Sequence, residues 1–440
     1  MSWHLFARAG ERPVARVAAM DWRAERLPGG ARTLAALACV FALLLMSRDP
    51  RVVTRAELWG DDGWSWYPDA YNHGLASLLL PVGGYLNTLQ RLGGLVGQLV
   101  PLRWAPTLFA ALALAVQILP PLFFVSARMA NAVPSAGYRL LIALVYLMLP
   151  NMIEAHANLT NSMWHLATLA LLVVMAVPAA GLAGRGFDLG VLTVSGLSGP
   201  FCAMLSPIAM LRFWHGRSPD SGRKLSIVLA TVLVQAAVYL NSPPGARSAA
   251  PLGAGPRMLA RIVATQVLLG AEFGYNAIAR LPGAPFWQDN APALAICGGA
   301  LGLTAVALLR GGWPLRGLCL FASLLLCAVL LKPSMSTTEP QWRLMTIPPM
   351  GNRYFMLPMV AWICVLFTLA ADRSRLLRGI GVTLLLIVLG WGIPQDWKYM
   401  DFTRTDFVAR ARAFAEAPPG TTMSFPQLPP GTAPMWLVKR

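Results

Sequence analysis

The sequence predicts an all-α, polytopic membrane protein, and three properties of its 440 residues support this fold class. First, 56% of the residues are hydrophobic and 12% are charged, about half the charged share of a soluble domain. Second, apolar stretches of roughly 17–25 residues, able to cross a ~30 Å hydrocarbon layer, recur along the chain. Third, these stretches are continuous and not alternating, which is the pattern of helices and not of a β-barrel.

We expect a bundle of about 10–12 transmembrane helices. Two short candidates flank the sequence GLSGPF, a Gly/Pro break that suits two half-length helices meeting inside the membrane. In chain order, the apolar segments are 33–47, 104–126, 138–150, 163–182, 187–197, 200–213, 225–240, 291–309, 316–332, 354–371 and 379–393.

One further apolar segment, 75–100, is interrupted by Pro81 and by paired glycines. We expect it to be a re-entrant or interfacial segment on the outer side, with a full membrane span as the alternative. It follows the first outer loop, which we place at 48–77. Outer re-entrant or amphipathic segments therefore belong to the predicted fold.

The distribution of charge predicts how the chain is oriented. With a basic cytoplasmic N-terminus over 1–32, the inside segments hold 18 of the 36 Lys and Arg residues but 6 of the 19 Asp and Glu residues. The transmembrane domain then covers 33–393, and a short outer tail covers 394–440. The net charge of +17 is concentrated at the ends of apolar runs, so it predicts membrane orientation and argues against a nucleic-acid partner.

The first outer loop gathers acids and aromatic residues in a chain that is otherwise poor in carboxylates. Its sequence AELWGDDGWSWYPDAYNHG covers residues 56–74. Acids in a partly desolvated cleft act as a general base on a hydroxyl or coordinate a divalent cation, and aromatic rings stack on sugars. The alternative is a solvated loop, because water hydrates carboxylates well. The candidate residues are Asp61, Asp62, Trp64, Tyr67, Asp69 and His73.

A second polar cluster, NMIEAHANLTNSMWH over 151–165, separates two apolar runs. Polar and ionisable groups at such depth are usually functional or paired. We therefore expect this loop to contribute to a site, with an ordinary hairpin loop as the alternative. The candidate residues are Glu154, His156, Asn158 and Asn161.

A third cluster is basic and lies in EPQWRLMTIPPMGNRYFMLP, residues 339–358. It sets Arg343 and Arg353 on the outer side, against the trend that basic residues face the cytoplasm. A guanidinium suits a phosphate, and Arg353 followed by Tyr354 opens an apolar helix at the depth of lipid headgroups. The alternative is that these arginines extend to the lipid headgroups without a specific ligand.

The order of these features resembles the GT-C superfamily, the multi-spanning glycosyltransferases that use polyprenyl-phosphate sugars as donors. An outer acid after the first helix, a second polar loop, a Gly-Pro break and an Arg-Tyr helix start follow one another along the chain. The resemblance covers roughly 33–215 and 340–371. It is closest to bacterial inner-membrane members with a minimal soluble part.

The resemblance implies roles for individual residues. The catalytic acid of the first outer loop corresponds to Asp62 or its neighbour Asp61, and a further acid of the second loop corresponds to Glu154. Arg353 and Tyr354 correspond to the Arg-Tyr pair that would hold the donor phosphate. The break SGLSGPF, residues 195–201, is similar to a loop where related enzymes carry a Lys-Gly pair, but this chain lacks the lysine.

We therefore expect a glycosyltransferase that moves a hexose or pentose from a polyprenyl-phosphate donor to a glycan, lipid or protein acceptor. The resemblance implies a multi-pass protein of the bacterial inner membrane, surrounded by membrane lipids, whose active site faces the periplasm and uses an outer-loop Asp as general base. The competing interpretation is a transporter, or a flippase for glycolipid precursors. Transporters usually place ionisable groups at mid-membrane, whereas the predicted helices here are nearly free of charge. A requirement for a divalent cation stays open, because the acids and histidines show no ligand spacing.

Overall fold

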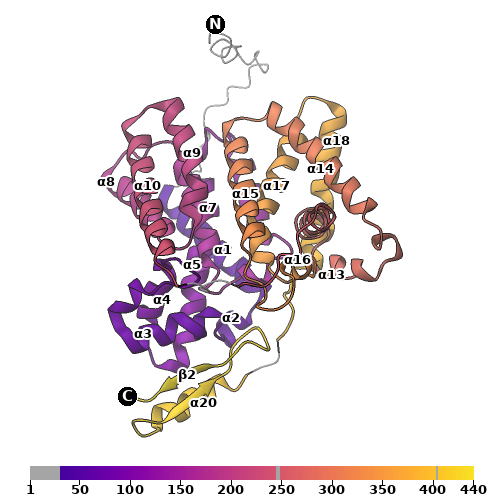
Figure 1. The fold of residues 1–440 in the computed structure, drawn as a ribbon. Coiled ribbons are helices and arrows are strands. Elements are labelled where there is room, and N and C mark those ends of the chain that lie inside the picture. Colours follow the sequence, from indigo (N-terminus) through magenta and orange to yellow (C-terminus); the bar gives the residue numbers. More distant parts are fainter. Residues whose placement is uncertain (1–29, 244–247, 403–404) are drawn as a thin grey trace.

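The computed structural model describes residues 30–243, 248–402 and 405–440, and it is helical apart from one two-stranded sheet. Seven helices in this described part are long and apolar enough to cross a membrane, which confirms a helical, polytopic membrane protein. They stand side by side in an upright bundle (Figure 1). These spans contain α1 (Gly30–Arg48), α5 (Ala105–Val125), α10 (Pro219–Leu240), α14 (Ala291–Arg310), α15 (Trp313–Leu331), α17 (Met356–Ala370) and α18 (Arg375–Ile387). Adjoining helical turns extend three of them, so that the spans of α5, α17 and α18 are Leu102–Val125, Asn352–Ala370 and Arg375–Gln395.

Four shorter helices complete the bundle, and one of them forms its centre. Eleven of the 14 residues of α7 are buried, as expected for a helix that is apolar on all sides. The predicted half-length segments form α8 and α9, separated by a turn in which Gly199 has a φ of +108°. The four helices are α6 (Ala136–Met148), α7 (Ser162–Met175), α8 (Leu182–Gly196) and α9 (Phe201–Gly216).

The break between α8 and α9 is held by Gln235 of α10. Irregular backbone inside a membrane bundle leaves carbonyl groups without helical partners, and these groups need another donor. The Gln235 side chain donates to the carbonyls of Leu86, Gly196 and Gly199 at 3.1–3.2 Å. It also accepts a hydrogen bond from the Leu86 amide at 2.9 Å. This buried amide therefore ties the break to the segment that precedes α4 (Thr88–Gly97).

Segment 75–100 does not cross the bundle as one helix. It contains part of a 3-10 helix (Gly74–Leu79) and then α4, whose ten residues rise only about 15 Å, half of a hydrocarbon layer. α4 packs closely on α3 (Tyr67–His73) because Gly94 faces the Trp66 carbonyl, where a Cβ would clash. Both helices lie at the lower end of the bundle in Figure 1.

The C-terminal segment folds against this same end. The predicted tail 394–440 contains a helix, α20 (Phe407–Glu416), and an antiparallel pair, β1 (Thr422–Phe425) and β2 (Met435–Val438) (Figure 1). Its side chains join one hydrophobic cluster with the first outer loop and α5. The buried aromatic members of this cluster are Trp66, Tyr67, Phe109, Phe407, Phe414 and Phe425.

Several short helices surround the second loop, and Asp396 connects two of them to it. The Asp396 carboxylate accepts hydrogen bonds from the backbone amides of Asn151 at 2.9 Å, Asn276 at 3.2 Å and Tyr275. These contacts fix the start of the second loop. The remaining short α-helices of the described residues are α2 (Arg51–Thr54), α11 (Pro256–Ile262), α12 (Gly270–Phe273), α13 (Tyr275–Ile278), α16 (Gln341–Met345) and α19 (Ile393–Gln395).

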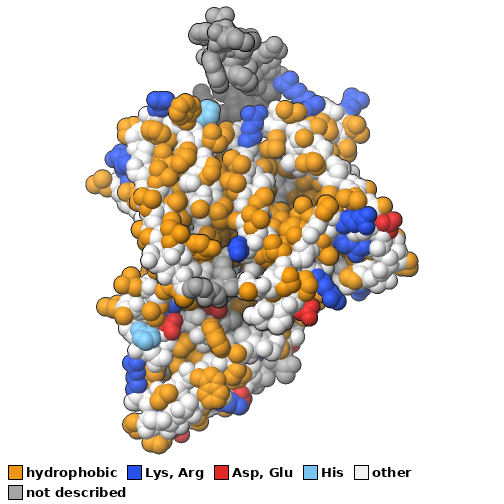
Figure 2. All heavy atoms as spheres, in the orientation of Figure 1, with side chains coloured by type: hydrophobic (Ala, Val, Ile, Leu, Met, Phe, Trp, Pro, Cys, Tyr) orange, Lys and Arg blue, Asp and Glu red, His pale blue; other side chains and the backbone are white. Residues whose placement is uncertain are grey.

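An apolar cavity of about 760 Å³ lies between α5, α6, α7, α15 and α17. Along α6 it extends from Tyr138 to the residue after the helix, Leu149, where the second loop begins. Its other end reaches Arg310 and Arg373, which are exposed. Figure 2 shows that the bundle face is covered mostly by hydrophobic side chains, with Lys and Arg side chains along its upper edge.

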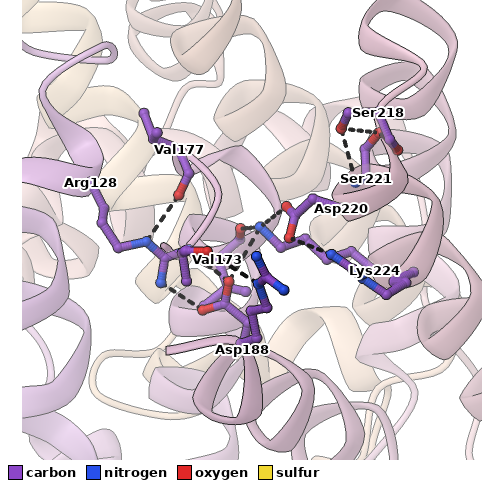
Figure 3. A network of polar contacts seen from close by, with 11 residues as sticks. Arg128, Val173, Val177, Asp188, Ser218, Asp220, Ser221 and Lys224 are labelled. Atoms are coloured by element: carbon purple, nitrogen blue, oxygen red, sulfur yellow. Dashed lines mark hydrogen bonds and ion pairs between the residues drawn. The ribbon is translucent and has the colours of Figure 1, made fainter. Parts of the chain in front are cut away.

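An ion network ties α8 to α10 and to the segment after α5 (Figure 3). Asp188 is 1% exposed and pairs with Arg128 at 2.7 Å and with Lys224 at 3.4 Å. Lys224 also pairs with Asp220 at 2.8 Å. The two acids thus neutralise Arg128 and the buried Lys224, as buried charges require, and Asp220 also approaches the exposed Arg223 at 3.8 Å. The apolar segments were predicted to form helices nearly free of charge, and this network was not predicted.

Candidate functional site

The first loop (48–77) and the second loop (151–165) meet through Asp62. A turn at Gly60, with a φ of +52°, and a π-helix (Asp62–Trp66) direct this side chain inward. Asp62 is 1% exposed and accepts hydrogen bonds from the Thr160 amide and hydroxyl, both at 2.7 Å, and from the Leu159 amide at 3.3 Å. Burial raises the pKa of Asp62 to about 7, although these donors oppose the rise. Asp62 therefore joins the two loops.

Asp61, by contrast, is partly buried, and its carboxylate makes no hydrogen bond or ion pair within the described residues. Burial raises its pKa, and the positive charges of Arg353 and Arg91 oppose that rise. Of the two neighbouring acids, Asp61 is the one whose oxygen atoms accept no hydrogen bond in the described structure. It is chemically suited to accept a proton.

Arg353 is held by Glu154 of the second loop. Its Nη1 donates to Glu154 Oε2 at 2.7 Å, and Glu154 Oε1 accepts from the Gly351 amide at 3.1 Å. The guanidinium lies over the Tyr354 ring, 4.3 Å from its centroid, and its Nη2 donates to the Tyr354 hydroxyl at 3.0 Å. The side chains of Arg353 and Glu154 are 22% and 18% exposed, so the pair lies at the surface of the site.

Asn158 and Asn161 shape the second loop from within. Their side-chain amides donate to the Glu154 carbonyl at 2.7 Å and 2.6 Å, and Asn158 Oδ1 accepts from the Asn161 amide at 2.9 Å. They therefore position Glu154 and do not themselves face Asp61. His156 is 6% exposed, and its ring lies 4.8 Å from that of Tyr399. Burial, followed by the charge of Arg48, lowers the pKa of His156 well below its ordinary value.

The remaining predicted residues lie in other environments. Asp69 forms an ion pair with the buried Arg91 at 2.5 Å, and Tyr67 is buried in the cluster with Phe109, where burial raises its pKa to about 12. Trp64 and His73 are exposed. Arg343 is 70% exposed on α16 and approaches Glu339 at 3.9 Å. The structure thus brings together Asp61, Asp62, Glu154, Arg353 and Tyr354.

Sequence reasoning missed several residues that organise this end. Arg48 is buried and donates to the carbonyls of Leu147, Leu149 and Asp396 at 2.9–3.1 Å. Arg91 is buried beside the Trp66 ring. Both arginines lie on the predicted outer side, so the departure from the positive-inside trend that singled out Arg353 could have found them too. Thr160 carried no such signal.

The described part of the chain holds no group of three or more His, Cys, Asp or Glu side chains that could bind a metal ion. At the site, the charges of Arg353 and Arg91 act on Asp61. The Glu154 oxygens already accept hydrogen bonds from the Arg353 guanidinium and the Gly351 amide. The arrangement is suited to hold a phosphate and to take up a proton. Comparison of the chain with family models, curated proteins and solved structures finds no match.

Proposed function

We propose that the chain is a membrane glycosyltransferase that transfers a sugar from a polyprenyl-phosphate donor to an acceptor hydroxyl. The observation that supports this proposal is the convergence of Asp61, Glu154 and Arg353. They come from three distant segments and form one site with a free acid beside an oriented guanidinium. The same chemistry suits a glycan, lipid or protein acceptor on the periplasmic face of a bacterial inner membrane.

In the proposed reaction, the acceptor hydroxyl attacks the anomeric carbon of the donor sugar. The bond between that carbon and the phosphate oxygen breaks, and the lipid phosphate leaves with the bonding electrons. The hydroxyl proton passes to the Asp61 carboxylate, which is a stronger base than an ordinary aspartate because burial raises its pKa. Arg353, oriented by Glu154, would stabilise the charge on the leaving phosphate.

The apolar cavity supports a lipid-linked donor. Its lining is predominantly hydrophobic, and its volume of about 760 Å³ is within the range of ligand sites. Leu149 joins the cavity directly to the second loop. An isoprenoid chain in this cavity would therefore place its phosphate end toward the loop that carries Glu154.

A transporter or lipid flippase is the second candidate function. It is favoured by the reach of the cavity to the exposed Arg310 and Arg373 at the end opposite the second loop. A flippase would move a glycolipid precursor between leaflets without breaking its sugar-phosphate bond. The two functions therefore differ in their product.

The test uses the purified full-length chain in lipid vesicles with radiolabelled polyprenyl-phosphate sugars. We expect release of lipid phosphate, and a fall of two or more orders of magnitude in Asp61→Asn, the usual scale for a lost general base. Asp406→Asn is the matched control, because Asp406 is an exposed acid paired with Arg410 on α20. Intact donor that crosses the vesicle membrane, with no phosphate released, would favour the flippase and overturn the proposed enzyme.

A further inference from the structure

A small pocket, here called the outer pocket, opens at the same end of the bundle. It lies between α2 and the residues after it, the second loop, and the segment 399–402, and has a volume of about 80 Å³. Exposed Arg55 and Asp401 lie at its rim, whereas His156 within it is 6% exposed. It therefore combines an open rim with a buried polar interior.

Three side chains of the outer pocket carry buried polar atoms that make no hydrogen bond in the described part of the chain. These atoms are both ring nitrogens of His156, the Tyr399 hydroxyl oxygen and Glu57 Oε2. The other Glu57 oxygen accepts from the Thr405 amide at 3.0 Å, which holds the side chain in place. Buried polar groups are nearly always hydrogen-bonded. Unpaired atoms from three separate segments around one pocket therefore point to a bound polar molecule.

The available groups match a neutral molecule with hydroxyls better than an anion. Of the two arginines that line the pocket, Arg51 already bonds Asp49 at 2.6 Å and Asp401, and Arg55 is exposed at the rim. His156 stays neutral because of its lowered pKa, and burial raises the pKa of the Tyr399 phenol to about 12, which keeps it protonated. The free atoms thus offer donors and acceptors side by side. Hydroxyl groups, which both donate and accept, complement such a set.

Aromatic rings line the remaining wall of the outer pocket. Trp59 and Phe402 pack edge to face with centroids 5.7 Å apart. The Tyr399 ring is fixed by the Arg48 guanidinium, 4.5 Å from its centroid, and by the His156 ring. Aromatic faces favour the C–H groups of a sugar ring. The volume is about half of the roughly 150 Å³ that holds benzene, so the pocket accommodates the edge of a ring.

We propose that the outer pocket binds one edge of a neutral sugar ring, the first unit of the acceptor. The recognition of a sugar follows from the pocket itself, and its role as acceptor rests on the proposed function. Tyr399 and Glu57 would bind adjacent hydroxyl groups, while Trp59 would cover the ring. The pocket shares the second loop with Glu154, and Trp59 is two residues before Asp61.

The test measures binding of methyl glycosides of common hexoses and pentoses to the full-length chain in nanodiscs, by saturation-transfer NMR. We expect Tyr399→Phe to weaken binding threefold to tenfold, and Glu57→Gln tenfold or more, the usual range for neutral and charged hydrogen bonds. Tyr71→Phe is the matched control, because the Tyr71 hydroxyl donates to the Val438 carbonyl outside the pocket. This control should bind like the wild type.

Three results would overturn the inference. They are the absence of binding by every glycoside, unchanged binding in the Tyr399→Phe/Glu57→Gln double variant, and displacement of the glycoside by inorganic phosphate. The first result would mean that the pocket holds only water. Because glycoside binding is measured without a lipid donor, a failure of the proposed transfer reaction leaves this measurement interpretable. If glycoside binding and sugar transfer both fail, each proposal is rejected by its own measurement.

Discussion

Arg353 Nη1 lies 2.7 Å from Glu154 Oε2, although 199 positions separate the two residues in the sequence. This contact ties the second loop to the start of the most buried of the seven long helices. Both side chains are partly exposed, so the pair contributes about 1 kcal/mol or less to stability. Its greater effect is to orient the guanidinium. Nη2 donates to the Tyr354 hydroxyl and the Ser334 carbonyl, so Nε and the second N–H of Nη1 are the groups left without a hydrogen bond in the described structure.

The first prediction concerns the geometry of Arg353. Arg353→Lys keeps the charge but loses the planar fork, so kcat/KM for the lipid-linked sugar should fall about tenfold. Arg353→Ala should lower it about a hundredfold, because a contact between charged groups is lost and Glu154 keeps only its hydrogen bond from the Gly351 amide. Donor titrations in vesicles would measure both effects. Arg343→Ala, which changes an exposed arginine on α16, should be silent, and unchanged kinetics in Arg353→Ala would reject phosphate binding.

Much of the fold followed from the sequence, because the length of an apolar run limits the helix that it forms. The predicted segment 104–126 is α5 (Ala105–Val125), and 291–309 is α14 (Ala291–Arg310). The folded C-terminal segment was not predicted. Its helix α20 is only weakly hydrophobic and is stabilised by contacts with Tyr67 and Phe109, more than 290 positions away. Contacts of this kind leave no local periodicity.

The candidate site was predictable in residue type but not in role. The sequence indicated the acids at 61 and 62, but neighbouring residues in a helical turn point about 100° apart. Only the position of the second loop decides which acid is bonded. Asp62 faces Thr160, 98 positions away, and Asp61 is left without a hydrogen bond in the described structure. Predicting this difference from sequence would require knowing how the two loops pack.

The second prediction concerns the side of the membrane on which each end lies. Ser65 and Ser162, central in the two loops, are buried, so a thiol reagent must be directed to exposed positions. Asn72→Cys and Thr337→Cys, in a background without the six native cysteines, should react with a membrane-impermeant reagent in intact spheroplasts. Arg375→Cys, at the opposite end of the bundle, should react only after lysis. The reverse labelling pattern would contradict the proposed orientation.

The third prediction tests the ion network of Figure 3. Asp188→Asn leaves Lys224, 3% exposed, with a weakened set of partners, so unfolding should become easier by about 3–5 kcal/mol. Asp372→Asn is the control, since Asp372 pairs at 2.6 Å with Arg310, whose side chain is 50% exposed, and should cost less than about 1 kcal/mol. Denaturation in detergent micelles would measure both. Equal effects would mean that burial of the network does not matter.

The last prediction is a pH dependence of stability set by Asp62. Burial raises its pKa in the folded protein from 3.8 to about 7, so the folded state binds a proton that the unfolded state releases. The wild type should therefore lose stability as pH rises from about 4 to about 7, and show no further loss from this group above 7. Each pKa unit corresponds to about 1.4 kcal/mol, so the loss is on the order of 4 kcal/mol at most. Thermal unfolding of wild type and Asp62→Asn, measured in detergent from pH 4 to pH 8, gives the comparison.

Asp62→Asn cannot ionise, so its stability should lack this part of the pH dependence. At pH 4 the variant should be the less stable protein. Its side-chain NH₂ is a donor and cannot accept, so it cannot replace the oxygen that accepts from the Thr160 or the Leu159 amide. The difference should shrink as pH rises, since only the wild type then buries a charge. Asp406→Asn, which changes an exposed acid, should follow the wild-type curve. If the curves of wild type and Asp62→Asn run parallel throughout, the Asp62 carboxyl group ionises in the folded protein as it does in water, and the contact between Asp62 and the second loop carries a negative charge over most of this pH range.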